Sequence, residues 1–367
     1  MNDHMVSAEH EALRDTVRQM LRHKATSADV RTANGYSAPL WRALCDEIGV
    51  SGITIPENFG GAGATLAEVH VVLAEIGRTL APVPMLSTVV ATEALVRCGN
   101  TSACERLLTA IAEGAVATVG WPDRDPYVLD GDIADINLAV RDGQLYEVNP
   151  TRREHVPTMD ITRRLATVDF TSATHLGPAP SEIRDIACIA LSAEQVGAAQ
   201  RCLDMTVEYT RTRVQFGRPI GGFQALKHRM ADMYVQVETA RSISEAAVHD
   251  LGLAAAAKAH CSTVLSTVAG EMIQLHGGIA ITWEHDAHLY FKRAHSSAQL
   301  FGGPREHIAV WEQQLRSARP DLDSRQARTL VHAGFGVVVE AGRDLRWQDT
   351  PGHRDAVAAL VVSALGL

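Results

Sequence analysis

The chain has 367 residues, 46% of them hydrophobic, and a net charge of −9. This length suits two or three packed units, and the acidic balance without a basic stretch argues against nucleic-acid binding. We expect a reduced cytoplasmic protein, because the charged N-terminus lacks a signal-peptide core, no apolar run predicts a membrane span, and the six scattered cysteines form no CxxC pair that would suggest a zinc site.

Residues 1–114 are expected to form an N-terminal α-helical domain. Ala38 to Ile48 places apolar residues near helical spacing. A loop rich in proline and glycine follows, and Thr65 with Glu68 has the spacing of a capping box that starts the next helix.

Residues 115–180 change character. Short segments there alternate apolar and polar residues between Asp-Gly and proline turns, which is typical of short antiparallel strands. Residues 181–317 return to long helical patterns, and 318–367 form an extension of unknown role. The sequence therefore predicts a mainly α fold with a small middle β domain and a C-terminal helical bundle.

Three motifs follow one another in a fixed order along the chain. They are IPENFGGAG, then RTRVQFGRPIGGFQALKHRMADM at 211–233, then IQLHGGIAITWE at 273–284. Together they resemble the acyl-CoA dehydrogenase family. The resemblance implies an N-terminal helical domain, a middle β domain, a four-helix bundle, and FAD-dependent oxidation of acyl-CoA thioesters to 2-enoyl-CoA.

The resemblance assigns cofactor-binding roles to six residues: Arg213, Phe216, Gln224, Gln274, Gly277 and Gly278. We call the second motif, at 211–233, the hinge motif, because it lies between two long helical patterns. In relatives, its arginine, phenylalanine and glutamine reach across a dimer interface to the ADP half of FAD in the neighbouring subunit. An arginine fork suits a pyrophosphate, and glycines let backbone approach it. The sequence thus predicts that this chain serves a cofactor held by another chain.

The catalytic positions of the family are altered. Relatives place a glutamate base at one of two positions, which here fall on Phe301 and Ala187, so no catalytic residue is predicted. Trp121 stands where relatives place the threonine that meets the flavin ring, and the β segment is shorter than in relatives by roughly fifty residues. The residues predicted to be missing are therefore those that would contact a flavin and a substrate bound by this chain itself.

A chain that keeps the residues for a neighbour's cofactor but lacks those for its own resembles one subunit type of some actinobacterial acyl-CoA dehydrogenases. These enzymes, notably those for steroid side chains, are α2β2 heterotetramers. We expect a catalytic homologue as partner, with FAD and acyl-CoA bound in the complex. Two alternatives remain. One is an active homo-oligomeric dehydrogenase whose base moved to Glu182, Glu194 or Glu284, and the other is a non-enzymatic scaffold with the same fold.

Other aromatic residues receive simpler interpretations. His285 and His288 lack a third ligand, so we expect no metal site there and an exposed helix face instead. Trp283 and Trp311 are expected to serve packing and not to contact the cofactor.

Overall fold

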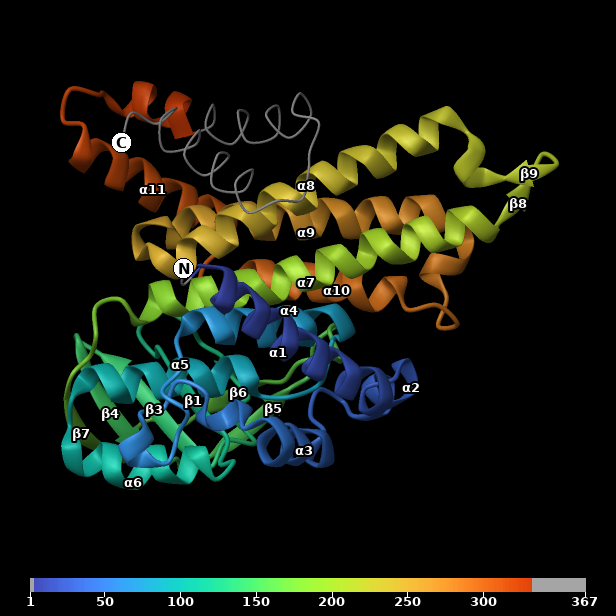
Figure 1. Ribbon diagram of the computed structural model, residues 1–367. Helices are drawn as coiled ribbons and strands as arrows, with labels where there is room; N and C mark the ends of the chain where they lie inside the picture. Colours follow the sequence, from blue (N-terminus) through green and yellow to red (C-terminus); the bar gives the residue numbers. More distant parts are fainter. Residues whose placement is uncertain (1–2, 332–367) are drawn as a thin grey trace. The chain divides into compact units, whose positions relative to one another are not determined.

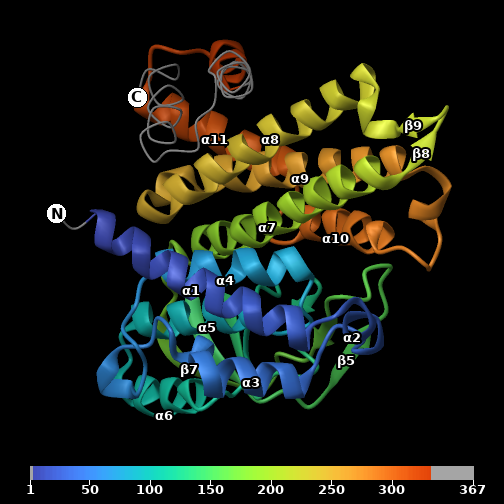
Figure 2. The same cartoon turned by 45° about the vertical axis from the view of Figure 1, so that its right-hand side comes forward.

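The computed structural model describes residues 3–331 and shows long helices with a small group of strands (Figures 1 and 2). The chain divides into two compact units, Met1–Glu194 and Gln195–Leu367, and the division falls inside a long helix, α7 (Ile183–Thr212). The elements confirm the predicted mainly α fold with a small middle β region. The predicted domain boundaries at 114 and 180 stay a prediction, because the compact units divide elsewhere.

The first unit begins with helices. They are α1 (Asp3–Lys24), α2 (Ser27–Thr32), α3 (Ala38–Ile48), α4 (Leu66–Thr79), α5 (Met85–Cys98) and α6 (Thr101–Ala112), with short 3-10 turns η1 (Val50–Gly52) and η2 (Glu57–Phe59). The predicted capping box is confirmed at α4. The Thr65 backbone N–H donates to the Glu68 carboxylate at 2.8 Å, and the Thr65 hydroxyl accepts from the Ala67 N–H at 3.1 Å.

The strands of the first unit are β1 (Ala117–Gly120), β2 (Val128–Leu129), β3 (Ile136–Arg141), β4 (Gln144–Val148), β5 (Arg153–Val156), β6 (Leu165–Val168) and β7 (Ala173–Pro178). One sheet has the order β1-β3-β4-β7, and another has the order β2-β6-β5. Asp142 and Gly143 have φ of 48° and 70° and close the β3–β4 hairpin, as the Asp-Gly pair predicts.

The prediction of antiparallel strands throughout was wrong for one pair. β1 runs parallel to β3, with Val119 opposite Leu138. A parallel pair needs a crossover connection, and the segment between these strands supplies it while contributing β2 to the second sheet. Local alternation of apolar and polar residues carries no information about this choice.

The second unit is a helical bundle with a small hairpin. After α7 come β8 (Val214–Gln215), β9 (Arg218–Pro219), η3 (Ile220–Gly222), α8 (Gln224–His249), η4 (Leu251–Leu253), α9 (Ala254–His276), η5 (Gly277–Ile281), α10 (Ala287–Gln299) and α11 (Pro304–Ala318). Helix α9 contacts α8, α10 and α11. Its first turn, Ala254–Ala257, is fully buried, and these small side chains let neighbouring helices approach closely.

Lys258 lies at the centre of this bundle with no exposed surface. Its ammonium group donates to the Ser262 hydroxyl at 3.0 Å and to the Ala298 carbonyl at 3.1 Å. Ala298 lies in the last turn of α10, where carbonyl groups are unsatisfied and carry partial negative charge. The buried lysine therefore closes the end of α10 just before the turn that contains Phe301.

One described segment, Leu251–Ile281, is long and apolar enough to cross a membrane by composition alone. It consists of α9 with its flanking turns, and most α9 side chains are buried against the bundle. Packing within the bundle thus accounts for its apolar character, and a cytoplasmic location stays a prediction. The backbone is helical again at 324–331, and the rest of the predicted extension at 318–367 lies outside the described residues.

Candidate functional site

The hinge motif forms a hairpin that projects a phenylalanine into solvent. β8 and β9 pair directly around Phe216 and Gly217, whose φ angles are 51° and 77°. Positive φ at both central residues is the pattern of a type I′ turn, and it is uncommon for a bulky side chain. Phe216 is nevertheless 91% exposed. A strained and exposed aromatic side chain indicates a contact that this chain alone does not supply.

The Arg213 backbone is fixed while its side chain is exposed. Its N–H donates to the Tyr209 carbonyl at 2.9 Å, and its carbonyl accepts from the Ile220 N–H at 2.8 Å. Gly221 permits this closure, because an added Cβ would lie 3.0 Å from the Thr210 carbonyl oxygen. The guanidinium is thus presented from a defined backbone position.

Gln224 is the exposed first residue of α8, and its amide nitrogen lies 2.9 Å from the His228 ring nitrogen. The residue before it, Phe223, makes no side-chain cap for the helix. The start of α8 therefore has no side-chain cap, although the Leu226 N–H donates to the Phe223 carbonyl at 3.1 Å. An anionic group is favoured at such a helix start.

The second group of predicted residues lies at the end of α9. Gln274 is exposed in its last turn, and Gly277 has φ 66° and ψ −145°. A Cβ on Gly277 or Gly278 would meet nothing within 4 Å, so glycine is required at 277 by backbone conformation and leaves the surface open. Figures 1 and 2 show the hairpin and the turn after α9 at the same end of the bundle.

The structure thus places two groups of residues at one end of the second unit. We call the six residues that the resemblance assigns to the cofactor the cofactor surface: Arg213, Phe216, Gln224, Gln274, Gly277 and Gly278. Exposed apolar residues in the turn after α9 extend it, namely Ile279, Ile281 and Trp283. Trp283, which was expected to serve packing, is 66% exposed, with the Lys292 ammonium 4.6 Å from its ring centroid. Trp311 is buried.

A cluster of three aromatic rings next to this surface was not predicted from the sequence. The Tyr209 ring stacks on His276 with centroids 4.4 Å apart, and His276 lies 4.6 Å from the His285 ring. The expectation of an exposed face at His285 and His288 was wrong, since His285 is half-buried and His288 is buried. In the described residues, no group of His, Cys, Asp and Glu side chains could hold a metal ion.

The two positions to which the resemblance assigns the base are apolar and buried. Phe301 is 7% exposed with φ 58°, and its carbonyl accepts from the His307 ring at 2.8 Å. Ala187 lies in α7 with no exposed surface. Neither residue can accept a proton from a carbon acid.

The alternative base candidates are paired or exposed. Glu182 lies 3.3 Å from Arg97, and a hydrogen bond from its own backbone N–H lowers its pKa. Glu194 is buried in an ion pair with Arg163. Glu284 lies exposed in the turn before α10. A base for this chemistry needs an available carboxylate in a dry pocket, whereas Glu182 and Glu194 are ion-paired and Glu284 is exposed.

Near the Glu194 ion pair lies a buried carboxyl group that the sequence did not suggest. Asp130 is 5% exposed, and the Ser87 hydroxyl donates to its Oδ2 at 2.7 Å. Burial raises the pKa of Asp130 to about 7, although the Ser87 hydrogen bond and the charge of Arg163 act in the opposite direction. Such a group titrates near neutral pH.

Trp121 fills the place that the resemblance gives to a flavin contact. Its side chain is 7% exposed, and the Arg184 guanidinium lies 5.8 Å from its ring centroid. Arg184 is held in turn by Asp125 at 2.9 Å. The side chain is therefore packed within the first unit.

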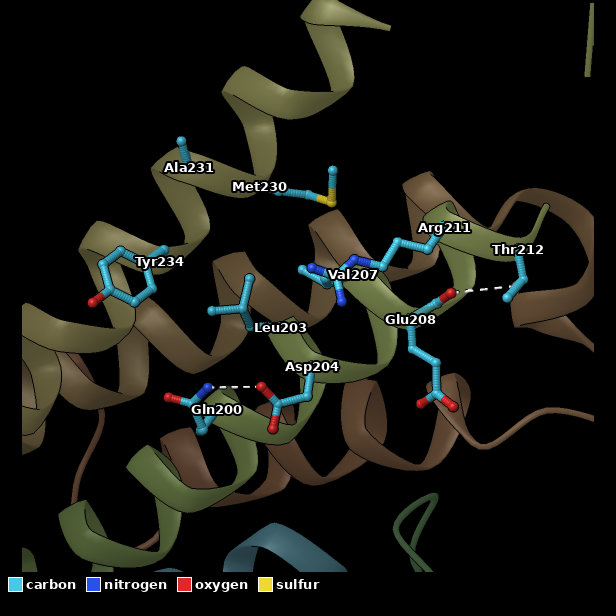
Figure 3. Close-up of a pocket in the computed structure, with 10 residues that line it drawn as sticks. All are labelled: Gln200, Leu203, Asp204, Val207, Glu208, Arg211, Thr212, Met230, Ala231 and Tyr234. Atoms are coloured by element: carbon cyan, nitrogen blue, oxygen red, sulfur yellow. Dashed lines mark hydrogen bonds between the residues drawn. The ribbon is translucent and has the colours of Figure 1, made fainter. Parts of the chain in front are cut away.

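A groove opens between α7 and α8 in the second unit. Figure 3 shows its apolar side chains, Leu203, Val207 and Met230, flanked by polar residues of α7 such as Asp204. Its volume is 640 Å³. It contains none of the six residues of the cofactor surface, so the pocket does not coincide with the predicted site.

Comparison with known proteins agrees with these observations. Residues 7–115 match the N-terminal domain and residues 185–309 the C-terminal domain of acyl-CoA dehydrogenases. The acyl-CoA dehydrogenase IpdE2 of Mycobacterium tuberculosis is 49% identical over 316 residues, which cover 83% of this chain and 98% of that one.

Two solved structures are similar over most of their length. A variant of the Tcur3481-Tcur3483 steroid ACAD has a TM-score of 0.77 at 29% identity, covering 85% of this chain and 99% of that one. The ChsE4-ChsE5 complex from Mycobacterium tuberculosis has a TM-score of 0.77 at 25% identity, covering 83% of this chain and 96% of that one. By sequence and by fold, the chain belongs to the acyl-CoA dehydrogenase family.

Proposed function

We propose that this chain is the subunit that completes the FAD site of a catalytic acyl-CoA dehydrogenase partner in an α2β2 complex. The observation that carries the proposal is a contrast within the second unit. The cofactor surface is exposed and held in defined backbone conformations, whereas Phe301 fills a base position with a buried ring. The chain thus presents binding groups for a neighbour's cofactor, but it has no catalytic group at this base position.

The cofactor surface suits the ADP half of FAD. Arg213 offers a guanidinium for the pyrophosphate beside the uncapped start of α8, and Phe216 offers an exposed ring for packing. The open Gly277–Gly278 turn lets backbone approach a phosphate or ribose. The isoalloxazine half has no such support in this chain, because Trp121 is packed in the place of its threonine contact.

In this family, bound FAD would serve as the hydride acceptor, and a carboxylate base would remove the α-proton of the acyl-CoA. In the proposed complex the partner contributes that base. This chain orients the ADP half and excludes water with the exposed rings of Phe216 and Trp283. The products would be a 2-enoyl-CoA and reduced flavin.

Two further observations support the partner and substrate class. One structural neighbour is a ChsE4-ChsE5 complex of two differently named chains, and another is described as a steroid ACAD. We infer that the partner is a homologue of the same fold and that the substrate is a steroid-derived acyl-CoA. An active homo-oligomer is less well supported, because Glu194 is neutralised by Arg163 and Glu182 by Arg97.

Expression of the chain alone and with a homologous catalytic subunit tests the proposal. We expect the lone chain to be colourless or insoluble, and the pair to purify together with one flavin per two unlike chains. A yellow lone chain that reduces FAD with an acyl-CoA would favour the homo-oligomeric alternative. A colourless soluble chain that ignores every homologue would favour the scaffold.

A further inference from the structure

Beyond the six predicted residues, one buried side chain, His276, joins both halves of the cofactor surface. It is the last residue of α9, directly before Gly277, and is 4% exposed. Its ring stacks on Tyr209 of α7 with an angle of 22° between planes. Its other neighbour is the His285 ring, tilted by 50°. Three different segments of the second unit therefore meet at one imidazole.

The contacts of Tyr209 continue directly to the hairpin. Its carbonyl accepts the Arg213 backbone N–H at 2.9 Å. Beside the stacked pair, the His285 Nδ1 accepts the Ala287 N–H at 3.1 Å, at the start of α10. A displacement of the His276 ring would therefore be transmitted to the backbone of Arg213 and to the Gly277 turn.

The hydrogen bonding of His276 fixes its tautomer. Its Nδ1 lies 2.8 Å from the Met272 carbonyl, which can only accept, so Nδ1 carries a proton. Its Nε2 is buried and has no hydrogen-bond partner among the described residues. Burial lowers the pKa of His276, the Met272 hydrogen bond acts in the opposite direction, and the neighbouring His285 lowers it further. The contacts of the ring itself are therefore mainly aromatic.

We propose that His276 is a positioning residue that stacks the Gly277–Gly278 turn against the end of α7 and so holds both halves of the cofactor surface in register. This inference rests on the proposed function, because it assigns the stacked ring a role in FAD binding. Tyr209 stacks on the His276 ring, and His285 packs beside these two rings, so a flat aromatic shape is the required property.

The test uses the co-expressed complex stripped of flavin and titrated with FAD, with flavin fluorescence as the readout. His276→Ala removes one stacked pair and one hydrogen bond, and we expect the Kd for FAD to rise about tenfold. His276→Phe keeps a flat ring and is expected to restore the Kd to within about threefold of wild type. His260→Ala is the matched control, because His260 is also buried in α9 but forms its hydrogen bond with Thr239 of α8, at 3.0 Å.

Thermal unfolding of each apo-complex identifies variants that fail to fold, and His285→Ala then provides an independent removal of the second ring contact. Arg213→Ala, measured in parallel, separates the two ideas. A normal Kd in both His276→Ala and His285→Ala, with a raised Kd in Arg213→Ala, overturns the positioning role alone. A phenylalanine variant as weak as alanine also overturns it. A normal Kd in Arg213→Ala contradicts the proposed function itself.

Discussion

Phe216→Asn is expected to make the complex more stable than Phe216→Ala does, and both variants are expected to weaken its hold on FAD. Phe216 has φ of 51°, and the left-handed region costs an L-residue roughly 1–2 kcal/mol. Asparagine visits this region more readily, because its short side chain bonds locally. Replacement of the phenylalanine by asparagine therefore removes backbone strain without changing the turn.

The loss of contacts within this chain is small by comparison. The side chain is 91% exposed, and full burial of a phenylalanine is worth only about 1.5–3 kcal/mol, so about 0.2 kcal/mol of burial is lost. The edge contact with Phe223, at 6.0 Å, adds a fraction of the ~0.5–1.5 kcal/mol typical of such pairs. Within this chain we therefore expect a net gain of about 0.5–1 kcal/mol, and the contacts that the ring makes with FAD are lost equally in both variants.

Phe216→Ala is the matched control, because it loses the same ring and keeps the strain. Thermal unfolding of the complexes should give the asparagine variant a Tm about 1 °C above that of the alanine variant. Both variants should retain less FAD than wild type after gel filtration. Equal melting temperatures would refute the strain argument, and unchanged flavin content in both would refute the contact between Phe216 and the cofactor.

Three further predictions concern FAD binding, catalysis by the lone chain and the pH dependence of stability. Arg213→Ala should weaken FAD binding by about 1.5–3 kcal/mol, or roughly ten- to hundredfold, which flavin titration would measure. The lone chain with added FAD should not bleach flavin absorbance with any acyl-CoA, since general-base catalysis is worth about 10²–10⁴-fold, and bleaching that is lost in Glu284→Gln would contradict this. Because the folded pKa of Asp130 is raised to about 7, its protonated form stabilises the fold at low pH and this contribution is lost as pH rises through about 7. Asp130→Asn should therefore raise the free energy of unfolding at pH 8, by on the order of 3–4 kcal/mol at most, and have little effect near pH 4. Thermal or denaturant unfolding would measure both effects. An equal gain at pH 4 and pH 8 would show that burial of the charge is not the cause.

Local features of the fold could be predicted because they depend on a few neighbouring residues. The Thr65 capping box and the Asp142–Gly143 hairpin form from contacts within three residues of the chain. The parallel pairing of β1 with β3 could not be predicted, since it depends on where the chain returns after β2. The motif order indicated the family, but the family does not determine which side chains are exposed.

The candidate site likewise contains features that neighbouring residues determine and features that depend on distant segments. Glycine at 277 was assigned to a close backbone approach, and the structure shows that its conformation needs glycine while the space around it is open. The cluster of the Tyr209, His276 and His285 rings could not be predicted, because the three residues lie on different segments and have no shared spacing. The exposure of Trp283 depends on the turn after α9, so its neighbours in the chain do not indicate it.

Under the proposed function, the turn at Phe301 shows how the fold can be kept at a position without a base. Phe301 has φ of 58° and the following Gly302 has φ of 101°, so the backbone makes a tight turn after the buried end of α10. The His307 ring holds this turn through the Phe301 carbonyl, and Lys258 holds the helix end through the Ala298 carbonyl. These contacts use backbone oxygens, so they do not depend on the side chain at 301. A phenyl ring at this position, where the resemblance places a carboxylate, provides no base and adds buried apolar surface, while the backbone contacts that hold the turn are kept.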